Sequence, residues 1–422
     1  MRIKIKGNEI HGVIKAPPSK SYTQRAIACA LLAEGKTTII NPSECEDAKA
    51  ALNAAKMLGA EIEKRGGKLI IKGGQVITPE DVINCKGSAT ALRLFTAISA
   101  LAPGITVLTG DETLRKRPVG ELLNSLNSLG VKCYSTKGNG LPPVVVMGGG
   151  IEGGRAYIRG DVSSQFISAL LISCTKAKND TILNIIKPIF SKNYIEMSLK
   201  VLSSFGADIE KTEEGFLIKG NQKLTPCDFV VEGDYSSAAF LIAAGLLMGD
   251  VSIEGLNFQS LQGDRRIIEI LNSMGGEIEI SNGILRARKS KLNGLILDMN
   301  DVPDLVPIIA VVATQADGTT IIKGIERLRL KESDRIITTT NMLRAFGAMV
   351  NIHENTIIIH GPSSLKAAKI NPFNDHRIAM ASAIASLIAK GESIIENAEC
   401  VSKSYPSFFD DLKSLGAKVE AL

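Results

Sequence analysis

Two cations stand at the start of an apolar helix near the amino terminus of this 422-residue chain. The stretch PPSKSYTQRA (17–26) opens with two prolines, which cannot continue a helix, and then has Ser19, a residue type that caps helices well. Lys20 and Arg25 follow at the amino-terminal end of a helix predicted over 19–33, where the helix dipole is already positive. The stretch therefore indicates an anion site. The alternative is that both side chains extend into solvent.

Polar side chains also precede five further apolar helices. We predict the six helices over residues 19–33, 87–102, 161–174, 234–247, 303–313 and 374–389. The polar residues at their starts are Lys20, Ser21, Arg25, Ser88, Thr90, Arg93, Ser163, Ser164, Gln165, Ser236, Ser237, Asp304, Asn374, Asp375, His376 and Arg377. Any one serine is most simply a helix cap. Together, hydroxyls and cations at equivalent helix ends indicate a site for a ligand with several anionic groups.

Two charged stretches, LRKRP (114–118) and RLKESDR (329–335), add more cations. We expect Arg117 and Arg335 to point inward, because each adjoins the start of a predicted helix. The cations expected to stay solvated are Arg115, Lys116 and Arg329. Arginine suits paired contacts to carboxylate or phosphate oxygens.

Two carboxylates, Asp304 and Glu332, stand among these cations. A carboxylate in a basic site is a candidate for proton transfer, although Asp304 could instead cap its helix. The patterns GxxxxGK[ST], HExxH and GxSxG are absent, and the chain has only four histidines. The remaining chemistry is acid–base and electrostatic catalysis on anionic small molecules, without a metal.

The composition is that of an ordinary globular protein, with 45% hydrophobic and 22% charged residues. A net charge of +5 argues against a protein that binds nucleic acid over a broad surface. Seven scattered cysteines without a CxxC pattern predict core residues in a reducing compartment. No signal peptide or membrane-spanning run is recognisable, so we expect a cytoplasmic enzyme with neither nucleic acid nor membrane as a partner.

One short segment recurs six times along the chain. Its copies are KMLGAEIE (56–63), NSLGVKCY (127–134), SSFGADIE (203–210), NSMGGEIE (272–279), RAFGAMVN (344–351) and KSLGAKVE (413–420). Each copy predicts an amphipathic helix that ends at a glycine and turns directly into a strand. The copies alternate with the six apolar helices, and short runs such as KLIIKG (68–73) predict further strands.

We expect three of these units in each of two domains, with the buried helices inside and the sheets outside. The first domain is predicted over residues 15–226, and the second over 227–422 together with 1–14. The starts of the buried helices would then line a cleft between the domains. One continuous solenoid is the alternative, but neither end of the chain has a polar capping unit.

These motifs resemble the EPSP synthase family, the 3-phosphoshikimate 1-carboxyvinyltransferases, along essentially the whole chain. The matching stretches are PPSKSYTQRA (17–26), GSATALR (87–93), LRKRPVGELL (114–123), SSQFISALL (163–171), FSKNYIEMSL (190–199), VEGDYSSAAF (231–240), QGDRR (262–266), DVPDLVP (301–307), RLKESDRI (329–336), FNDHRIAM (373–380) and VSKSYPSFF (401–409). The resemblance implies the α/β (α+β) fold of the enolpyruvyl transferases. This fold has two inverse α/β barrel-like domains and six repeated β-α-β-α-β-β units, three in each domain.

The resemblance also implies a reaction and a set of site residues. The enolpyruvyl group of phosphoenolpyruvate moves to the 5-hydroxyl of shikimate 3-phosphate by addition and elimination, and phosphate is released. Shikimate 3-phosphate would be bound by Lys20, Ser21, Arg25, Ser163, Ser164, Gln165, Ser191, Tyr194, Asp304 and Lys331. Phosphoenolpyruvate would be bound by Lys20, Ala89, Arg117, Gln165, Arg335, Arg377 and Lys403.

The same resemblance implies how protons move. Asp304 would accept the proton of the attacking hydroxyl, and Glu332 or Lys20 would deliver protons to the methylene carbon and the leaving phosphate. It implies no metal and no cofactor, and we expect the enzyme to be a monomer.

Two alternative functions differ from this interpretation in identifiable residues. UDP-N-acetylglucosamine 1-carboxyvinyltransferase shares the fold and chemistry, but usually carries a reactive cysteine in the loop aligned with residues 108–117. Here that loop is LTGDETLRKR, without a cysteine. A non-catalytic six-repeat scaffold that binds nucleic acid would need no carboxylates such as Asp304 and Glu332 among its cations.

One position departs from the glyphosate-sensitive members of the resembled family. They have glycine beside phosphoenolpyruvate in the loop Asn-Ala-Gly-Thr, whereas the aligned residue of GSAT (87–90) is Ala89. The extra methyl group narrows the pocket, so we predict weak inhibition by glyphosate, which is longer than phosphoenolpyruvate, with substrate binding retained. An inhibition constant measured against phosphoenolpyruvate checks this, and a low-micromolar value would contradict it.

Overall fold

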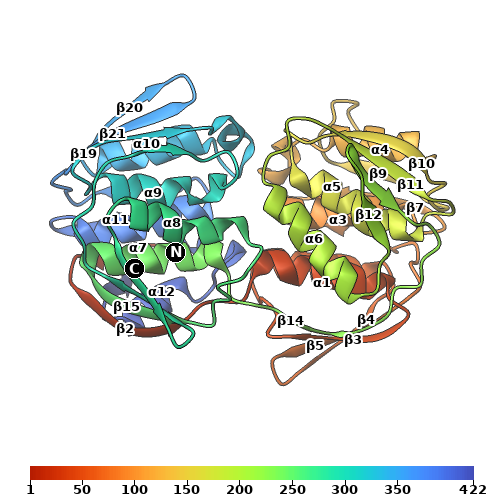
Figure 1. Cartoon of the computed structure of the whole chain (residues 1–422), viewed down its shortest axis with the longest axis horizontal. Coiled ribbons are helices and arrows are strands. Elements are labelled where there is room, and N and C mark those ends of the chain that lie inside the picture. The colour runs from red at the N-terminus through yellow and green to blue at the C-terminus, as the bar shows by residue number, and fades with distance from the viewer. The chain divides into compact units, whose positions relative to one another are not determined.

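The computed structural model describes residues 1–422. The chain divides into two compact units, one formed by Pro18–Glu232 and the other by Met1–Pro17 together with Gly233–Leu422. We call them the Pro18–Glu232 unit and the Gly233–Leu422 unit, and many of their helices and strands are labelled in Figure 1. The domain limits expected from the sequence, after residues 14 and 226, stay a prediction.

The Pro18–Glu232 unit contains three four-stranded sheets and six α-helices. Its elements are α1 (Lys20–Leu32), β3 (Gly35–Ile40), α2 (Glu46–Met57), β4 (Glu61–Arg65), β5 (Lys68–Gly73), β6 (Ile83–Asn84), α3 (Ala89–Ser99), β7 (Ile105–Thr109), η1 (Leu114–Lys116), α4 (Gly120–Ser128), β8 (Lys132–Ser135), β9 (Val144–Met147), β10 (Gly154–Arg159), α5 (Ser164–Ser173), η2 (Cys174–Lys176), β11 (Thr181–Ile186), α6 (Lys192–Ser204), β12 (Ile209–Lys211), β13 (Gly215–Ile218) and β14 (Asp228–Val230).

The Gly233–Leu422 unit has the same composition of sheets and helices. Its elements are β1 (Ile3–Lys6), β2 (Ile10–Lys15), α7 (Tyr235–Met248), β15 (Gly249–Glu254), η3 (Gly263–Arg266), α8 (Ile267–Ser273), β16 (Glu277–Ser281), β17 (Ile284–Arg288), β18 (Ile296–Asp298), η4 (Pro303–Leu305), α9 (Val306–Ala313), β19 (Gly318–Lys323), η5 (Glu326–Leu330), α10 (Arg335–Ala345), β20 (Met349–His353), β21 (Thr356–Gly361), β22 (Lys369–Ile370), α11 (His376–Ile388), β23 (Glu392–Ile395), η6 (Ala398–Lys403), α12 (Phe408–Ser414) and β24 (Lys418–Ala421).

All six sheets share one strand order. In β6-β7-β9-β8, for example, the first two strands are parallel and the others pair antiparallel. β2 precedes α1 in the chain but pairs with β15, whereas β14 precedes α7 but pairs with β3. Each of these two strands therefore completes a sheet formed by a distant segment of the chain. The amino-terminal strand β1 completes the last sheet between β23 and β24. The predicted fold of six β-α-β-α-β-β units is therefore confirmed.

Every predicted amphipathic helix ends at a glycine with positive φ. The six glycines are Gly59, Gly130, Gly206, Gly275, Gly347 and Gly416, with φ between 73° and 108°. This conformation strains residues with a Cβ, so glycine lets the chain leave each helix and enter the next strand within a few residues.

Serines cap the three buried helices of the Pro18–Glu232 unit. The side chains of Ser19, Ser88 and Ser163 each accept a backbone N–H from the first turn of α1, α3 or α5. These helices are buried on nearly every face, so their polar ends are the places where ligand-binding side chains can reach solvent. In the other unit, α7 and α11 are capped by Asp234 and Asp375 instead.

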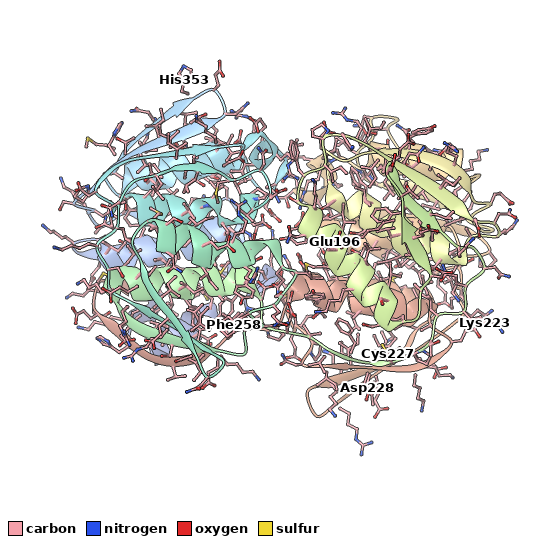
Figure 2. The ribbon with its side chains drawn as sticks, viewed as in Figure 1. Glu196, Lys223, Cys227, Asp228, Phe258 and His353 are labelled. Atoms are coloured by element: carbon pink, nitrogen blue, oxygen red, sulfur yellow. The ribbon has the colours of Figure 1, made fainter.

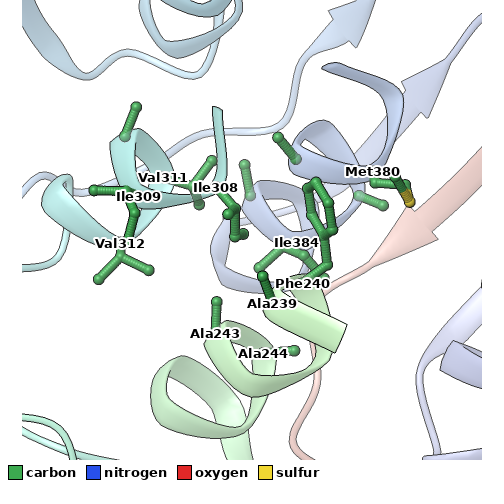
Figure 3. Packing of buried hydrophobic residues seen from close by; sticks show 14 of the residues in the cluster. Ala239, Phe240, Ala243, Ala244, Ile308, Ile309, Val311, Val312, Met380 and Ile384 are labelled. Atoms are coloured by element: carbon green, nitrogen blue, oxygen red, sulfur yellow. The ribbon is translucent and has the colours of Figure 1, made fainter. Parts of the chain in front are cut away.

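The core of the Gly233–Leu422 unit forms where α7, α9 and α11 pack together (Figure 3). Small residues on α7, such as Ala239 and Ala243, allow close approach of Ile308 from α9 and Ile384 from α11. Phe240 fills the space beside them and makes an edge-to-face contact with a ring of α12. The apolar burial of these three helices holds their amino-terminal ends in place.

The structure also bears on the membrane, cysteine, histidine and metal expectations of the sequence analysis. None of the helices combines the length and apolarity that crossing a membrane requires. Six of the seven cysteines are buried, and Cys227 is half-buried next to Asp228 (Figure 2). His353 lies at the exposed end of the β20–β21 hairpin (Figure 2). No group of three or more His, Cys, Asp or Glu side chains is arranged to hold a metal ion.

Replacing Phe240 with alanine tests how much this core contributes to stability. Phe240 is fully buried and its ring centroid lies 6.2 Å from that of Phe408. We expect Phe240→Ala to lower the free energy of unfolding by about 3–5 kcal/mol, because it removes buried surface and leaves a cavity. Urea unfolding measures the change. The control Ile296→Ala, at a side chain that is 67% exposed, should cost less than about 1 kcal/mol. Equal losses in both variants would contradict the prediction.

Candidate active site

The start of α1 holds Lys20 against a carboxylate that the sequence analysis did not single out. Lys20 Nζ lies 2.9 Å from Asp47 Oδ2, and both side chains are more than four-fifths buried. Gln24 Nε2 donates to the carbonyl oxygen of Asp47 at 2.7 Å and to Ser88 Oγ at 2.8 Å. Ser88 caps α3, whose first residue is the buried Ala89. Gln24 thus ties the ends of α1, α2 and α3 together.

Arg25 is a buried cation surrounded by neutral acceptors. Its guanidinium donates to Ser198 Oγ at 2.7 Å and to Ser168 Oγ at 3.3 Å. It also donates to the carbonyl oxygens of Ser21 and Tyr194, at 3.0 and 3.2 Å. Burial lowers the pKa of Arg25 to about 10, and no carboxylate pairs with it. An anionic group beside Arg25 would therefore gain strongly from the contact.

Arg93 joins the start of α5 to the loop that carries Arg117. It donates to Ser163 Oγ at 3.0 Å, to Gln165 Oε1 at 2.7 Å and to the carbonyl oxygen of Pro118 at 2.8 Å. Its guanidinium stacks over the ring of Phe166 at 4.7 Å. Arg93 therefore positions two predicted site residues, a role that the sequence analysis did not assign.

Three more predicted residues of this unit are Ser164, Ser191 and Tyr194. Ser164 and Ser191 are buried, and Tyr194 is half-buried on α6 with its ring 5.8 Å from the guanidinium carbon of Arg25. Ser191 precedes α6 in a left-handed conformation with φ of 53°. Arg117 is buried as predicted, whereas Arg115 and Lys116 are exposed as predicted.

Arg335 lies at the centre of an ion network in the Gly233–Leu422 unit. Its guanidinium contacts Asp375 through two nitrogens, at 2.8 and 3.1 Å. It also donates to Glu332 Oε2 at 2.6 Å and to Asp304 Oδ1 at 2.7 Å. Burial alone would lower the pKa of Arg335, but the three carboxylates raise it above its ordinary value. The inward direction predicted for Arg335 is confirmed, since its side chain is 1% exposed.

Asp304 accepts contacts from three cations. Lys331 Nζ and Arg335 Nη1 lie 3.1 and 2.7 Å from its Oδ1, and Arg377 Nη2 lies 3.3 Å from its Oδ2. Burial favours the neutral acid, but the cations outweigh it and hold the pKa of Asp304 well below its ordinary value. In this state Asp304 is a weak base. Its alternative role as a helix cap is wrong, because no side-chain cap is formed at η4 or α9.

Arg377 and Lys403 flank the start of α11. The cap Asp375 accepts the backbone N–H of Arg377 at 3.0 Å, so this carboxylate serves both the helix and the ion network. Lys403 lies in η6 and donates to the carbonyl oxygen of Asn374 at 2.9 Å. Both cations are more than nine-tenths buried.

Each unit therefore gathers its own share of the predicted residues. In one, the contacts link Ser21, Arg25 and Tyr194, and Arg93 links Ser163 to Gln165. In the other, a single network contains Asp304, Lys331, Glu332, Arg335 and Arg377. The sequence analysis missed Asp47, Gln24, Ser168 and Ser198. Asp47 stands in the first turn of an amphipathic helix, where an acidic residue is usually explained by the helix dipole alone.

Replacing Arg335 with methionine tests whether this network is structural. We expect Arg335→Met to lower the free energy of unfolding by about 3–5 kcal/mol, because Asp375 is fully buried and loses its cation. Urea unfolding of the purified protein measures the loss. In the control Arg286→Met, the lost pair with Asp250 is exposed, and stability should barely change. A variant at Arg335 as stable as this control would contradict the prediction.

Comparison with known proteins agrees with the architecture of both units. A model of the family described as EPSP synthase (3-phosphoshikimate 1-carboxyvinyltransferase) matches residues 5–412. A 3-phosphoshikimate 1-carboxyvinyltransferase of Methanocaldococcus jannaschii is 44% identical over 420 residues, covering 98% of each chain. Another, from Methanococcus maripaludis strain C5, is 43% identical over 429 residues and covers all of both chains.

Two solved structures share the architecture of this chain. EPSP synthase from Acinetobacter baumannii superposes with a TM-score of 0.83 at 27% identity, covering 100% of both chains. The enolpyruvyl transferase NikO from Streptomyces tendae shares the fold, with a TM-score of 0.82 at 19% identity over 99% of this chain and 98% of its own. The chain belongs to the EPSP synthase family, the 3-phosphoshikimate 1-carboxyvinyltransferases.

Proposed function

We propose that this chain transfers the enolpyruvyl group of phosphoenolpyruvate to the 5-hydroxyl of shikimate 3-phosphate in the shikimate pathway of aromatic amino-acid biosynthesis. The products are 5-enolpyruvylshikimate 3-phosphate and phosphate. The observation that carries the proposal is the family match over residues 5–412. Both substrates have a phosphate and a carboxylate, which suits a protein that keeps several cations buried at helix starts.

Shikimate 3-phosphate binds, in this proposal, to Lys20, Ser21, Arg25, Ser163, Ser164, Gln165, Ser191, Tyr194, Asp304 and Lys331. The surroundings of Arg25 support this assignment, because the cation has hydroxyl and carbonyl partners but no carboxylate. An anionic oxygen of the substrate would supply the missing negative charge. Hydroxyls such as Ser163 can donate to the same anion.

Phosphoenolpyruvate binds to Lys20, Ala89, Arg117, Gln165, Arg335, Arg377 and Lys403. Among the cations that contact Asp304, Arg377 lies farthest from it, at 3.3 Å, so this contact is the one most readily exchanged for a contact to a substrate anion. Arg335 is held by three carboxylates, and its role is to present a fixed charge rather than to move. Each substrate is thus proposed to contact residues of both units.

Asp304 becomes the catalytic base when the substrates arrive. Substrate anions that pair with Arg377, Lys331 and Arg335 reduce the positive field on its carboxylate, so the pKa of Asp304 rises toward its ordinary range. It then accepts the proton of the 5-hydroxyl while the hydroxyl oxygen bonds to the central carbon of phosphoenolpyruvate. Asp304 thus remains a weak base until both substrates are present, which limits unproductive hydrolysis of phosphoenolpyruvate.

The remaining proton steps balance the addition and the elimination. The methylene carbon gains a proton as the tetrahedral intermediate forms and loses one as the double bond is restored. The bond from the central carbon to the phosphate oxygen breaks as this methyl proton leaves. The electron pair of the C–H bond forms the double bond, and phosphate departs with the electron pair of the C–O bond and takes up a proton. We assign the delivery of protons to the methylene carbon and to the leaving phosphate to Glu332 or Lys20. We also propose that the enzyme is cytoplasmic and acts as a monomer, without a cofactor or a macromolecular partner. Gel filtration can check the oligomeric state.

Phosphate release from phosphoenolpyruvate tests the proposed function. We expect release with shikimate 3-phosphate and none with UDP-N-acetylglucosamine, without added metal. In Asp304→Asn the rate should fall by about 10²–10⁴-fold, because the amide cannot accept the proton. Release only with UDP-N-acetylglucosamine, or none from folded protein with either acceptor, would overturn the proposal.

A further inference from the structure

A second buried carboxylate, Asp264, lies close to the catalytic network but has no role in the reaction described above. It is 1% exposed and belongs to η3. Ser236 Oγ donates to its Oδ2 at 2.5 Å, while its Oδ1 is buried without a hydrogen-bond partner. A buried carboxylate oxygen without a donor is costly, so its presence calls for an explanation.

Ser236 connects this carboxylate to the site. Ser236 lies in the first turn of α7, and its carbonyl oxygen accepts from Arg377 Nη1 at 3.4 Å. Arg377 Nη2 lies 3.3 Å from Asp304 Oδ2. A continuous path therefore runs from Asp264 through Ser236 and Arg377 to Asp304. Two carboxylates lie on opposite ends of this path, with one guanidinium between them.

The charges that face Asp264 come from three neighbouring elements. Asp304 belongs to η4, Arg377 to α11, and Asp234 caps α7. In its own turn, Arg265 donates instead to the carbonyl oxygen of Phe258 at 2.7 Å, and Arg266 is exposed. Arg377 is therefore the cation that offsets the charge of Asp264.

These surroundings shift the pKa values of Asp264 and Asp304 in opposite directions. Burial, with a further contribution from the charge of Asp304, raises the pKa of Asp264 to about 6, although Arg377 and the Ser236 hydroxyl oppose the shift. The pKa of Asp304 moves in the opposite direction. Carboxyl groups pushed apart in this way commonly divide their tasks within a site.

We propose that Asp264 is a positioning residue for the enolpyruvyl transfer. It fixes the guanidinium of Arg377 through Ser236 and so strengthens the binding of phosphoenolpyruvate. This inference rests on the proposed function. Ionised Asp264 anchors the Ser236 hydroxyl and attracts Arg377, and both effects keep the guanidinium beside Asp304 and the substrate. Protonated Asp264 is uncharged and loosens this arrangement.

The ratio of kcat/KM for phosphoenolpyruvate between wild type and Asp264→Asn tests the proposal. Measured at each pH over about pH 5 to 9, the ratio cancels the titration of the substrates themselves. We expect it to reach about tenfold above pH 7, mainly through KM for phosphoenolpyruvate, and to approach one below about pH 5, where the wild-type carboxyl is neutral like the amide. KM for shikimate 3-phosphate should change less.

Two further variants make the test specific. Ser236→Ala keeps the Asp264 carboxylate but removes the hydroxyl that donates to it, so the ratio of wild type to this variant should be smaller than the ratio for Asp264→Asn. Because the hydroxyl stabilises ionised Asp264, the acidic limb of the kcat/KM profile of Ser236→Ala should move to higher pH. The control Asp250→Asn changes a carboxylate that pairs with Arg286 on an exposed sheet, and it should equal wild type at every pH.

Four outcomes would overturn the inference. They are a ratio for Asp264→Asn of one throughout, a loss that is the same at every pH, a tighter hold on phosphoenolpyruvate in that variant, and an acidic limb that does not move in Ser236→Ala. If Asp264→Asn does not fold, Ser236→Ala carries the test alone. Failure of the proposed function is distinguishable, because wild type itself would then release no phosphate with shikimate 3-phosphate.

Discussion

Arg335 has almost no contact with solvent, and its charge is balanced by Asp304, Glu332 and Asp375. A buried guanidinium is tolerated only with such partners, so each of these residues depends on the others. Asp375 also caps α11, which couples the start of a core helix to the ion network. Asp304, the proposed catalytic base, is therefore held by ion pairs that also stabilise the fold, and these ion pairs determine its charge state.

The Pro18–Glu232 unit keeps its cations in another way. Arg25 has hydroxyl and carbonyl partners only, whereas Lys20 has a carboxylate partner in Asp47. Neutral acceptors satisfy the hydrogen bonds of a guanidinium without cancelling its charge. The Pro18–Glu232 unit thus retains a positive charge on Arg25 that no carboxylate balances, which suits the proposed binding of a substrate anion. In the other unit, the cations Lys331, Arg335 and Arg377 are paired with Asp304.

The repeated architecture explains why these groups occur at helix starts. In every unit of the repeat a helix is buried on nearly all faces, so its side chains cannot carry polar chemistry except at an end. The amino-terminal ends offer free N–H groups and a positive dipole, which suit substrate phosphates and carboxylates. The other proposed site residues lie on or just before the amphipathic helices. They are Ser191 and Tyr194 at the start of α6, Lys331, Glu332 and Arg335 at the start of α10, Arg117 before α4 and Lys403 before α12.

Local sequence determined much of this protein. The caps at Ser19 and Ser88, the six helix-ending glycines and the buried directions of Arg117 and Arg335 were predictable, because each depends on a few neighbouring residues. Tertiary structure alone decided the partners. The pairings of β2 with β15 and of β14 with β3, the pairing of Lys20 with Asp47 and the path from Asp264 to Asp304 join residues far apart in the chain. No local pattern encodes such pairs, since they arise only when apolar burial brings the helix ends together.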